Sequence, residues 1–429
     1  MDNNLINSKP YRVSRVLYIL EAALEYFISI LVAGSYLATL TEYIGISDSV
    51  TGVISAFISL GCVFQLMSVF LKKGRIKSVV VPLSVLNQLM FMLLYVIPLT
   101  GMGDGAKKLV FVAMIFSAYF VYNSIHPLKI GWLMSLVEDK RRGIFTSRKE
   151  IVSLISGMIF TYITGAVIDH YKDNGQIETA FLICGAAIFV LTVLHTLTMV
   201  FSVENTEKSE GAQENSGKNP VGQMMSVMRD KSVLKVIVLF VLWNIAVYAA
   251  TPFYGTYQIK ELGFSMKFVS LLAIVYSIVR ASVSTFWGKY ADRRSFAVMV
   301  RACFVIAGTG FFVNIFTVPS NGAIMYTLYY ALYAVAWGGI SSALINLVFD
   351  FAKPDERSNA LAVTQAASGL VGFFTTLAVS PLVEYIQASG NRLFGMNIYA
   401  QQAVSAIAFL FTAVAVVYLS VKIIPKKEK

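Results

Sequence analysis

The sequence predicts an all-α polytopic membrane protein, with twelve transmembrane helices in two pseudo-symmetric six-helix halves. Composition is the first reason: 57% of the 429 residues are hydrophobic and only 14% are charged, whereas soluble domains carry roughly 25% charged residues. Such a chain has too little polar surface to face water on all sides. The second reason is a series of apolar runs long enough to cross a bilayer. The third is an internal repeat at half the chain length.

The repeat consists of an apolar helix, a short turn of mixed charge that contains arginine, and another apolar helix. In the first half the turn contains Arg142, and in the second half it contains Arg357, 215 residues later. A half-length repeat in a very apolar chain is typical of a membrane transporter built from two halves.

Apolar runs between charged or Gly/Pro-rich breaks predict the individual spans, because a helix needs about 20 apolar residues to cross the hydrocarbon core. The twelve predicted spans are 14–40, 49–71, 78–99, 109–136, 145–169, 179–202, 233–258, 267–290, 297–318, 323–349, 359–385 and 400–424. The stretch after the sixth span is too polar to bury, which predicts a linker. The chain therefore divides into an N-terminal half (1–202), a cytoplasmic linker (203–230) and a C-terminal half (231–429).

The distribution of lysine and arginine predicts that both termini are cytoplasmic. In that orientation, most basic residues fall in the cytoplasmic segments. The external segments keep only Lys107, Lys108, Lys172, Lys260, Lys267 and Arg392. The net charge of +11 therefore reflects membrane topology and not a nucleic-acid partner. Because the N-terminus does not resemble a cleavable signal, we expect the first span to be retained in a multi-pass protein of the plasma membrane.

The turn after the eighth span carries a recognisable motif. It reads Gly288-Lys-Tyr-Ala-Asp292-Arg293-Arg-Ser295 and resembles the loop motif of the major facilitator superfamily: Gly, three residues, Asp, then Arg or Lys, then Gly. Ser295 replaces the second glycine, and the matching turn of the first half has Leu71 where the aspartate belongs. With the twelve spans, the resemblance covers essentially the whole chain and implies the fold of that superfamily.

In that superfamily the motif helps to hold the cytoplasmic side closed while the cavity faces outward. The resemblance therefore implies a cytoplasmic gate, formed by Gly288, Asp292, Arg293, Arg142 and Arg357. Asp292 can dock against the positive N-terminal end of a helix, and we expect this end to be the start of the fifth span, near residues 146–148. The alternative is that these charges only set topology and solvate the turns.

Ionisable residues inside predicted spans are functional candidates, because a charge in the bilayer is costly. Glu21 and Glu25 lie one turn apart on one face of the first span. Glu25, Lys129 and Arg280 each lie about ten residues from the cytoplasmic end of a span, which is roughly 15 Å deep. We expect these three groups to pair around a central cavity. The alternatives are that Lys129 snorkels to the surface and that Glu21 is a topology or packing residue.

The resemblance also implies that the first, fourth, seventh and tenth spans line this cavity. Each carries a polar or aromatic stripe at helical spacing. The predicted substrate-cavity residues are Asn123, His126, Lys129, Asn244, Tyr248, Arg280, Tyr330, Tyr333 and Trp337. The alternative for Tyr254, Tyr257 and Tyr326 is an aromatic belt at the membrane interface. His195 is alone in the sixth span, where packing is the favoured interpretation.

Glu25 is the leading candidate for a coupling residue, with Glu21 beside it. Burial favours the neutral carboxylic acid, whereas a nearby cation favours the carboxylate, so Glu25 would bind a proton in one cavity state and release it in another. The sequence therefore predicts proton-coupled uptake, by alternating access, of a small polar solute of the sugar or organic-acid type. Lys129 and Arg280 would act as counter-charges or substrate anchors.

Efflux and solute sensing are the alternatives to uptake. Drug antiporters of the superfamily often carry a Gly-Pro motif in the fifth span, and residues 156–165 contain no proline, which favours uptake. A non-transporting receptor is disfavoured by the short linker and tail. We expect no enzyme activity, because no nucleophile constellation, metal cluster or phosphate-binding glycine loop accompanies the glutamates. The expected partners are the solute, H+ and the lipid bilayer, with no metal or cofactor, and we expect a monomer.

Overall fold

The computed structural model describes residues 8–65, 75–137, 142–204, 227–353, 356–393 and 395–424. The turn with Leu71, the side chain of Arg142 and most of the predicted linker lie outside the described residues. In the described part of the chain, eleven helices are long and apolar enough to cross a membrane, and a shorter apolar helical stretch covers Asp48–Gly61 in the second predicted span. These helices confirm the predicted fold class, an all-α polytopic membrane protein.

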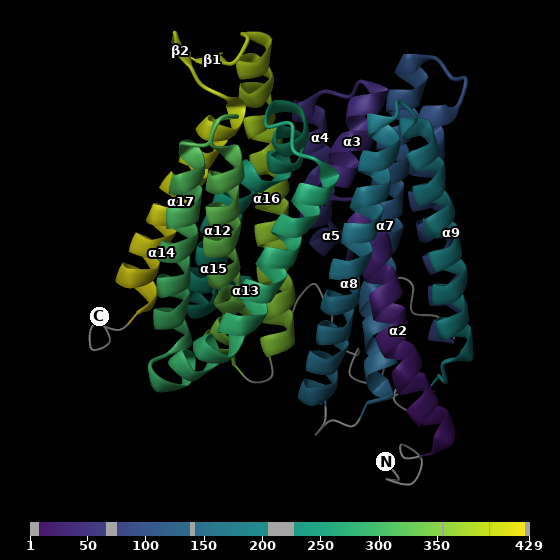
Figure 1. Ribbon diagram of the computed structural model, residues 1–429. Coiled ribbons are helices and arrows are strands. Elements are labelled where there is room, and N and C mark those ends of the chain that lie inside the picture. Colours follow the sequence, from purple (N-terminus) through teal and green to yellow (C-terminus); the bar gives the residue numbers. More distant parts are fainter. Residues whose placement is uncertain are drawn as a thin grey trace. The chain divides into compact units, whose positions relative to one another are not determined.

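The first compact unit comprises Met1–Ile46, Val63–Gly217 and Ser265–Ser270. Its main helices are α2 (Lys9–Leu31), α3 (Gly34–Ile44), α6 (Ile76–Val96), α7 (Asp104–Ser135), α8 (Arg142–Asp173) and α9 (Ile177–Phe201), with a short 3-10 turn η2 (Ile97–Leu99). Helix α6 packs against α7 and α9. Helix α2 packs against α8 and α9 (Figure 1). The first span breaks between α2 and α3, where Gly34 has a positive φ of 53° that favours glycine.

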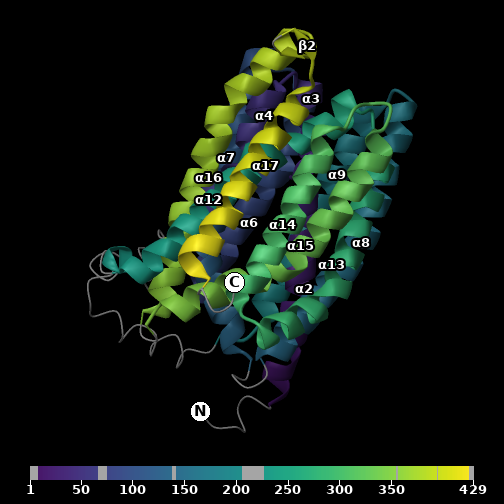
Figure 2. The same cartoon turned by 90° about the vertical axis from the view of Figure 1, so that its left-hand side faces the viewer.

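The second compact unit comprises Ser47–Cys62, Lys218–Phe264 and Leu271–Lys429. Its helices are α4 (Asp48–Ser55), α5 (Phe57–Phe64), α12 (Lys231–Thr256), η5 (Tyr257–Glu261), α13 (Met266–Arg293), α14 (Phe296–Ile315), α15 (Gly322–Phe351), α16 (Arg357–Ala388), α17 (Ala400–Tyr418) and η6 (Leu419–Ile423). Strands β1 (Arg392–Leu393) and β2 (Met396–Asn397) form an antiparallel pair before α17. Helix α14 packs against α15 and α17, and α12 packs against α16 and α17 (Figure 2).

Helix α4 joins the second unit although it lies early in the chain. It packs against α12 and α16, and its backbone at Gly52 lies directly against the ring of Phe253. Asp48 accepts a hydrogen bond of 2.6 Å from Gln387 and forms an ion pair with Lys260. Close backbone packing and a shared carboxylate therefore place residues 47–62 with helices far along the chain, because Lys260 and Gln387 follow Asp48 by 212 and 339 residues.

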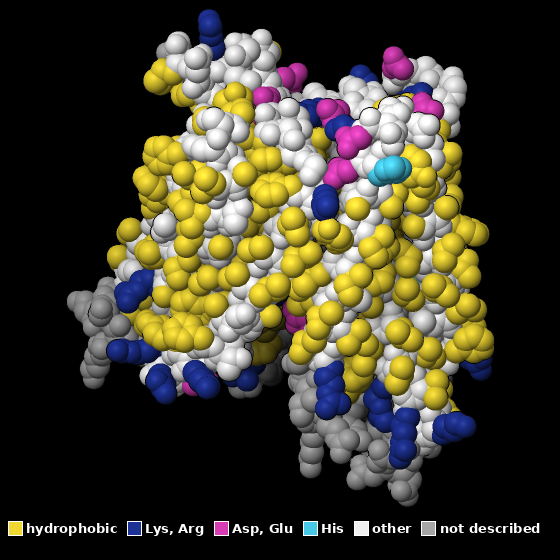
Figure 3. All heavy atoms as spheres, in the orientation of Figure 1, with side chains coloured by type: hydrophobic (Ala, Val, Ile, Leu, Met, Phe, Trp, Pro, Cys, Tyr) yellow, Lys and Arg dark blue, Asp and Glu magenta, His cyan; other side chains and the backbone are white. Residues whose placement is uncertain are grey.

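The helices expose apolar side chains over much of their length. Leu109 and Ile324 are each 72% exposed, and Phe201 is 69% exposed. On the face shown in Figure 3, hydrophobic side chains cover the sides of the helices, while Lys and Arg side chains gather near helix ends. Large apolar surfaces of this kind are rare in soluble monomers. They suit helices whose sides contact lipid.

Candidate functional site

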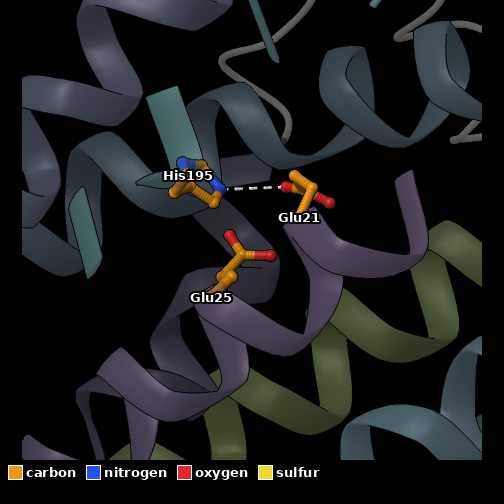
Figure 4. A group of neighbouring side chains, drawn as sticks. All are labelled: Glu21, Glu25 and His195. Carbon is orange, nitrogen blue, oxygen red and sulfur yellow. Dashed lines mark hydrogen bonds and ion pairs between the residues drawn. The ribbon is translucent and has the colours of Figure 1, made fainter. Parts of the chain in front are cut away.

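An ion cluster lies between α2, α7 and α9 in the first unit. The ammonium of Lys129 lies 2.9 Å from Oε1 of Glu21 and also pairs with Glu25. The same Oε1 of Glu21 is 3.0 Å from Nε2 of His195 (Figure 4). The side chains of Glu21 and Lys129 are each 3% exposed, and that of His195 is 1% exposed. Charges buried in this way are tolerated when they are paired and hydrogen-bonded.

Helix geometry explains how two glutamates reach one lysine. Glu21 and Glu25 are four residues apart on α2, so their side chains lie on the same face one turn apart. Both carboxylates contact Lys129 of α7, 104 residues further along the chain from Glu25. The pairing of Lys129 with Glu25 is the one expected from their equal depth. Lys129 does not snorkel, because it is buried and bonded to both glutamates.

His195 and Gln88 are the members of this cluster that the sequence analysis missed. The apolar surroundings of His195 in α9 favour a packing role, yet its ring hydrogen-bonds to Glu21 on one side and to Nε2 of Gln88, 3.0 Å away, on the other. The sequence feature that could have placed His195 beside Glu21 is their similar depth within the sixth and first spans. His195 lies seven residues before Ser202, at the end of its span, and Glu21 lies six residues after Arg15, which borders the first span.

The carboxylates and the imidazole come close enough to share a cation. Ligand atoms of Glu21, Glu25 and His195 lie within 4.8 Å of one another, an arrangement that the sequence analysis did not expect. The ammonium of Lys129 already supplies a positive charge to both carboxylates. The positive charge that neutralises part of this cluster is therefore the side chain of Lys129.

The polar stripe of α7 continues from this cluster. Asn123 is buried, and its Nδ2 donates to the carbonyl of Tyr119 at 2.9 Å. The ring of Tyr122 lies 5.9 Å from the ammonium of Lys129 and 5.3 Å from the ring of His126. Nδ1 of His126 is buried and has no hydrogen-bond partner among the described residues. The stripe therefore keeps one polar atom near the cluster available for a further hydrogen bond.

The aromatic stripe of α15 forms a packed series of rings in the second unit. The rings of Tyr333 and Trp337 are 6.0 Å apart and nearly parallel, at 19°. Trp337 in turn lies 6.4 Å from Trp243 of α12. The hydroxyl of Tyr330 accepts a hydrogen bond of 3.0 Å from Gln258. These contacts gather flat aromatic faces between α12 and α15, and the amide of Gln258 in η5 joins them.

Tyr254, Tyr257 and Tyr326 do not form an interfacial belt. They are 5%, 4% and 0% exposed, whereas belt residues face lipid head groups and water. The hydroxyl of Tyr326 donates to Gln401 at 2.6 Å, and that of Tyr254 bonds to Ser405 at 2.9 Å. The belt interpretation is therefore wrong, because these rings are part of the core of the second unit.

The remaining predicted cavity residues also lie in the second unit. Asn244 is half-buried, and its Nδ2 donates to the carbonyl of Phe240, in its own helix, at 2.9 Å. Tyr248 packs so closely on Gly372 that an added Cβ there would lie 2.7 Å from the ring. Arg280 is half-buried on α13. Its pairing with the glutamates remains a prediction.

The predicted gate residues occupy helix ends. Gly288, Asp292 and Arg293 are exposed in the last part of α13. Nε of Arg357 donates to the carbonyl of Phe349 at 3.2 Å, and its guanidinium lies 5.6 Å from that ring. Because the last carbonyls of a helix lack partners within it, this bond caps the end of α15. Docking of Asp292 remains a prediction, as does the role of Arg142, whose side chain lies outside the described residues.

Comparison with known proteins places this fold. A sequence model of the Major Facilitator Superfamily matches residues 20–376. No curated protein sequence matches the chain. A point variant of the nucleoside transporter NupG superposes with a TM-score of 0.72 at 13% identity, covering 95% of this chain and 99% of that one.

Two further solved structures are similar over nearly the full length. A D-xylose-proton symporter has a TM-score of 0.70 at 14% identity and covers 98% of this chain and 99% of its own. An auto-inhibited peptide transporter of the POT family has a TM-score of 0.68 at 12% identity, with coverage of 97% and 98%. At these identities, the similarity shows a common fold.

Proposed function

Because this chain belongs to the Major Facilitator Superfamily, we propose that it is a secondary active transporter that takes up a small polar solute together with protons. The observation that carries the proposal is the ion cluster of Lys129 with Glu21 and Glu25, buried within membrane-spanning helices. Ionisable groups at such depth mark ion or substrate pathways. Alternating access of the two halves would expose this cluster to one side of the membrane at a time.

Charge balance explains how the cluster would handle a proton. Two carboxylates and one ammonium leave one negative charge in excess, and protonation of either carboxylate removes it. A net charge away from water is unfavourable, so the cluster favours proton binding when it is closed off. The side chain of Glu25 is 21% exposed and that of Glu21 only 3%. Glu25 is therefore the leading coupling residue, with Glu21 as its partner.

The side chains that would bind the solute suit a ring with polar substituents. The faces of Tyr333 and Trp337, with Tyr330 beside them, offer stacking surfaces. Nδ1 of His126 offers a hydrogen-bonding atom near the cluster. Two of the similar structures are a nucleoside transporter and a D-xylose-proton symporter, whose named substrates contain sugar rings. These features support a sugar-type solute, and Lys129 and Arg280 would also accommodate an acidic group.

The proposed orientation follows the basic residues. Both termini would lie in the cytoplasm of a plasma-membrane protein, and Asp292, Arg293 and Arg357 would act at the cytoplasmic gate together with Arg142 and Gly288. Arg357 already links the turn to the end of α15 through the carbonyl of Phe349.

Uptake into proteoliposomes under an imposed pH gradient tests the coupling. Candidate solutes are first screened by thermal stabilisation of the purified protein, because a ligand stabilises the state that it binds. We expect the wild type to concentrate the solute when the outside is acidic, and Glu25→Gln only to equilibrate it. Glu42→Gln is the matched control, since Glu42 is an exposed glutamate in the same span.

Three outcomes would contradict parts of the proposal. If Glu25→Gln concentrates the solute as well as the wild type does, Glu25 is not the coupling site. If the wild type never responds to a pH gradient, proton coupling is wrong. Loss of preloaded solute against its gradient, driven by external acid, would show efflux in place of uptake.

A further inference from the structure

The imidazole of His195 lies between two groups of opposite hydrogen-bonding character. Its Nε2 is 3.0 Å from Oε1 of Glu21, and its Nδ1 is 3.0 Å from Nε2 of Gln88. A carboxylate only accepts hydrogen bonds and an amide nitrogen only donates them. In this arrangement Nε2 carries the hydrogen and Nδ1 accepts, so the ring is neutral. All three side chains are buried.

Gln88 has a second buried atom that has no role in this arrangement. Its Oε1 has no hydrogen-bond partner among the described residues, which is uncommon for a buried carbonyl oxygen. A half-turn of the amide about its last torsion would bring Oε1 to Nδ1 of His195. There it would accept a hydrogen bond from a protonated ring. Gln88 is thus able to bond to His195 in either protonation state.

The ionised groups around His195 have a net charge that one added proton would neutralise. From α2 it faces Glu21, with Glu25 one turn further along; from α7, Lys129 bridges the two carboxylates. From α6 the facing group is the neutral amide of Gln88. With neutral His195, the cluster carries one excess negative charge.

Four further titratable groups among the described residues lie close to the cluster: Tyr18, Lys149, Tyr122 and His126. Tyr18 precedes Glu21 by one turn of α2. Lys149 of α8 is half-buried and lies 5.0 Å from the ring of Tyr18, outside these ion pairs. A proton on His195 would neutralise the one excess negative charge of Glu21, Glu25 and Lys129.

We propose that His195 is a proton-binding group of the transport cycle and that Gln88 is its positioning residue. Hydronium gives up the proton and becomes water, an N–H bond forms at Nδ1, and the Gln88 amide turns to accept it. No other bond changes. The proposal rests on the proposed proton coupling and deepens it: His195 holds a proton inside the protein, beside the carboxylates of Glu21 and Glu25.

Nitrogen NMR of the full-length protein tests the proposal without any transport measurement. The chain has three histidines, and loss of a signal in His195→Gln identifies the resonances of His195. We expect the ring nitrogens of His195 to change from the neutral to the protonated form between about pH 8 and about pH 5, the range in which imidazole changes charge most readily. If His195 stays neutral throughout this range in wild-type protein, it is not a proton-binding group.

Two variants of Gln88 should move the titration in opposite directions. Gln88→Glu supplies a permanent acceptor for the Nδ1 hydrogen and should raise the midpoint pH by roughly one unit, a tenfold change in proton affinity. Gln88→Leu removes the acceptor and should lower it by a similar amount. Thr192→Val is the matched control, since Thr192 is buried one turn before His195 and bonds only within its own helix in the described structure.

The outcomes separate this inference from the proposed function. Midpoints that move in the same direction in both variants, or do not move at all, would overturn the role of Gln88. A titrating His195 in a protein whose uptake ignores the pH gradient would uphold the proton site and overturn the coupling. A His195 that never titrates, in a protein that responds to the gradient, would do the reverse.

Discussion

The backbone amide of Met266 donates a hydrogen bond of 2.7 Å to Oδ1 of Asp169. The next amide, that of Lys267, donates one of 2.7 Å to Oδ2. A carboxylate near the end of α8 therefore caps the first turn of α13, where amides have no partner within the helix. Ser270 adds a hydrogen bond of 3.0 Å to the carbonyl of Thr161. These contacts explain why residues 265–270 belong to the first unit.

Removing this cap should destabilise the protein. We expect Asp169→Ala to lower the free energy of unfolding by about 1 kcal/mol, as loss of a helix N-cap does, and to lower the melting temperature of the detergent-purified protein. Asp173→Ala is the control, because Asp173 is exposed on the same helix. Equal melting temperatures for the two variants would show that the cap contributes nothing.

Removing the shared cation should cost far more. Lys129→Met would leave the buried carboxylate of Glu21 beside the half-buried carboxylate of Glu25 without their shared cation, and breaking a buried pair in this way costs about 3–5 kcal/mol. We expect a large loss of thermal stability, part of which Lys129→Met combined with Glu21→Gln should restore, because residues in one network are not additive. Additive losses in the double variant would argue against a shared network.

The close contact between Gly52 and Phe253 should not tolerate a side chain. A Cβ added at Gly52 would lie 2.1 Å from a ring carbon of Phe253, so Gly52→Ala forces a shift that we expect to cost about 1–3 kcal/mol. Gly105→Ala is the control, since nothing lies within 4 Å of its added Cβ. Thermal melts compare the two variants. Replacing the ring with a smaller side chain, in Phe253→Leu, should reduce the loss of stability that Gly52→Ala causes.

Cysteine labelling tests the predicted orientation. Ala106 and Arg294 are exposed and belong to segments predicted to lie outside and inside the cell. In a background without native cysteines, we expect a membrane-impermeant maleimide to label Ala106→Cys in intact cells and Arg294→Cys only after permeabilisation. The opposite labelling pattern would invert the topology.

The pairing of Lys129 with Glu25 was predictable because depth in a membrane helix can be counted along the chain at about 1.5 Å per residue. The spacing of Glu21 and Glu25 likewise placed both on one face. The part of His195 in this cluster was not predicted, because the sixth span is apolar around its whole circumference and its pattern does not show which side faces α2. The packing of α9 on α2 and α6 decides that rotation.

The tyrosines of the tenth span also show which features the sequence predicts and which depend on helix packing. Their helical spacing predicted a stripe on one side of α15. Whether a stripe faces lipid or protein depends on neighbouring helices, and here Tyr326 is buried against residues 254 and 401. The spacing alone could not separate a core from an interfacial belt.

The sequence by itself determined the apolar helices and the depth of each charge within them. The physical reason is local: a bilayer requires about 20 apolar residues per crossing, and the backbone must satisfy its own hydrogen bonds within each helix. Tertiary structure alone decided which further groups touch these charges. Glu21 and His195 are 174 residues apart, and their hydrogen bond depends on the rotation and packing of two helices, which no local pattern encodes.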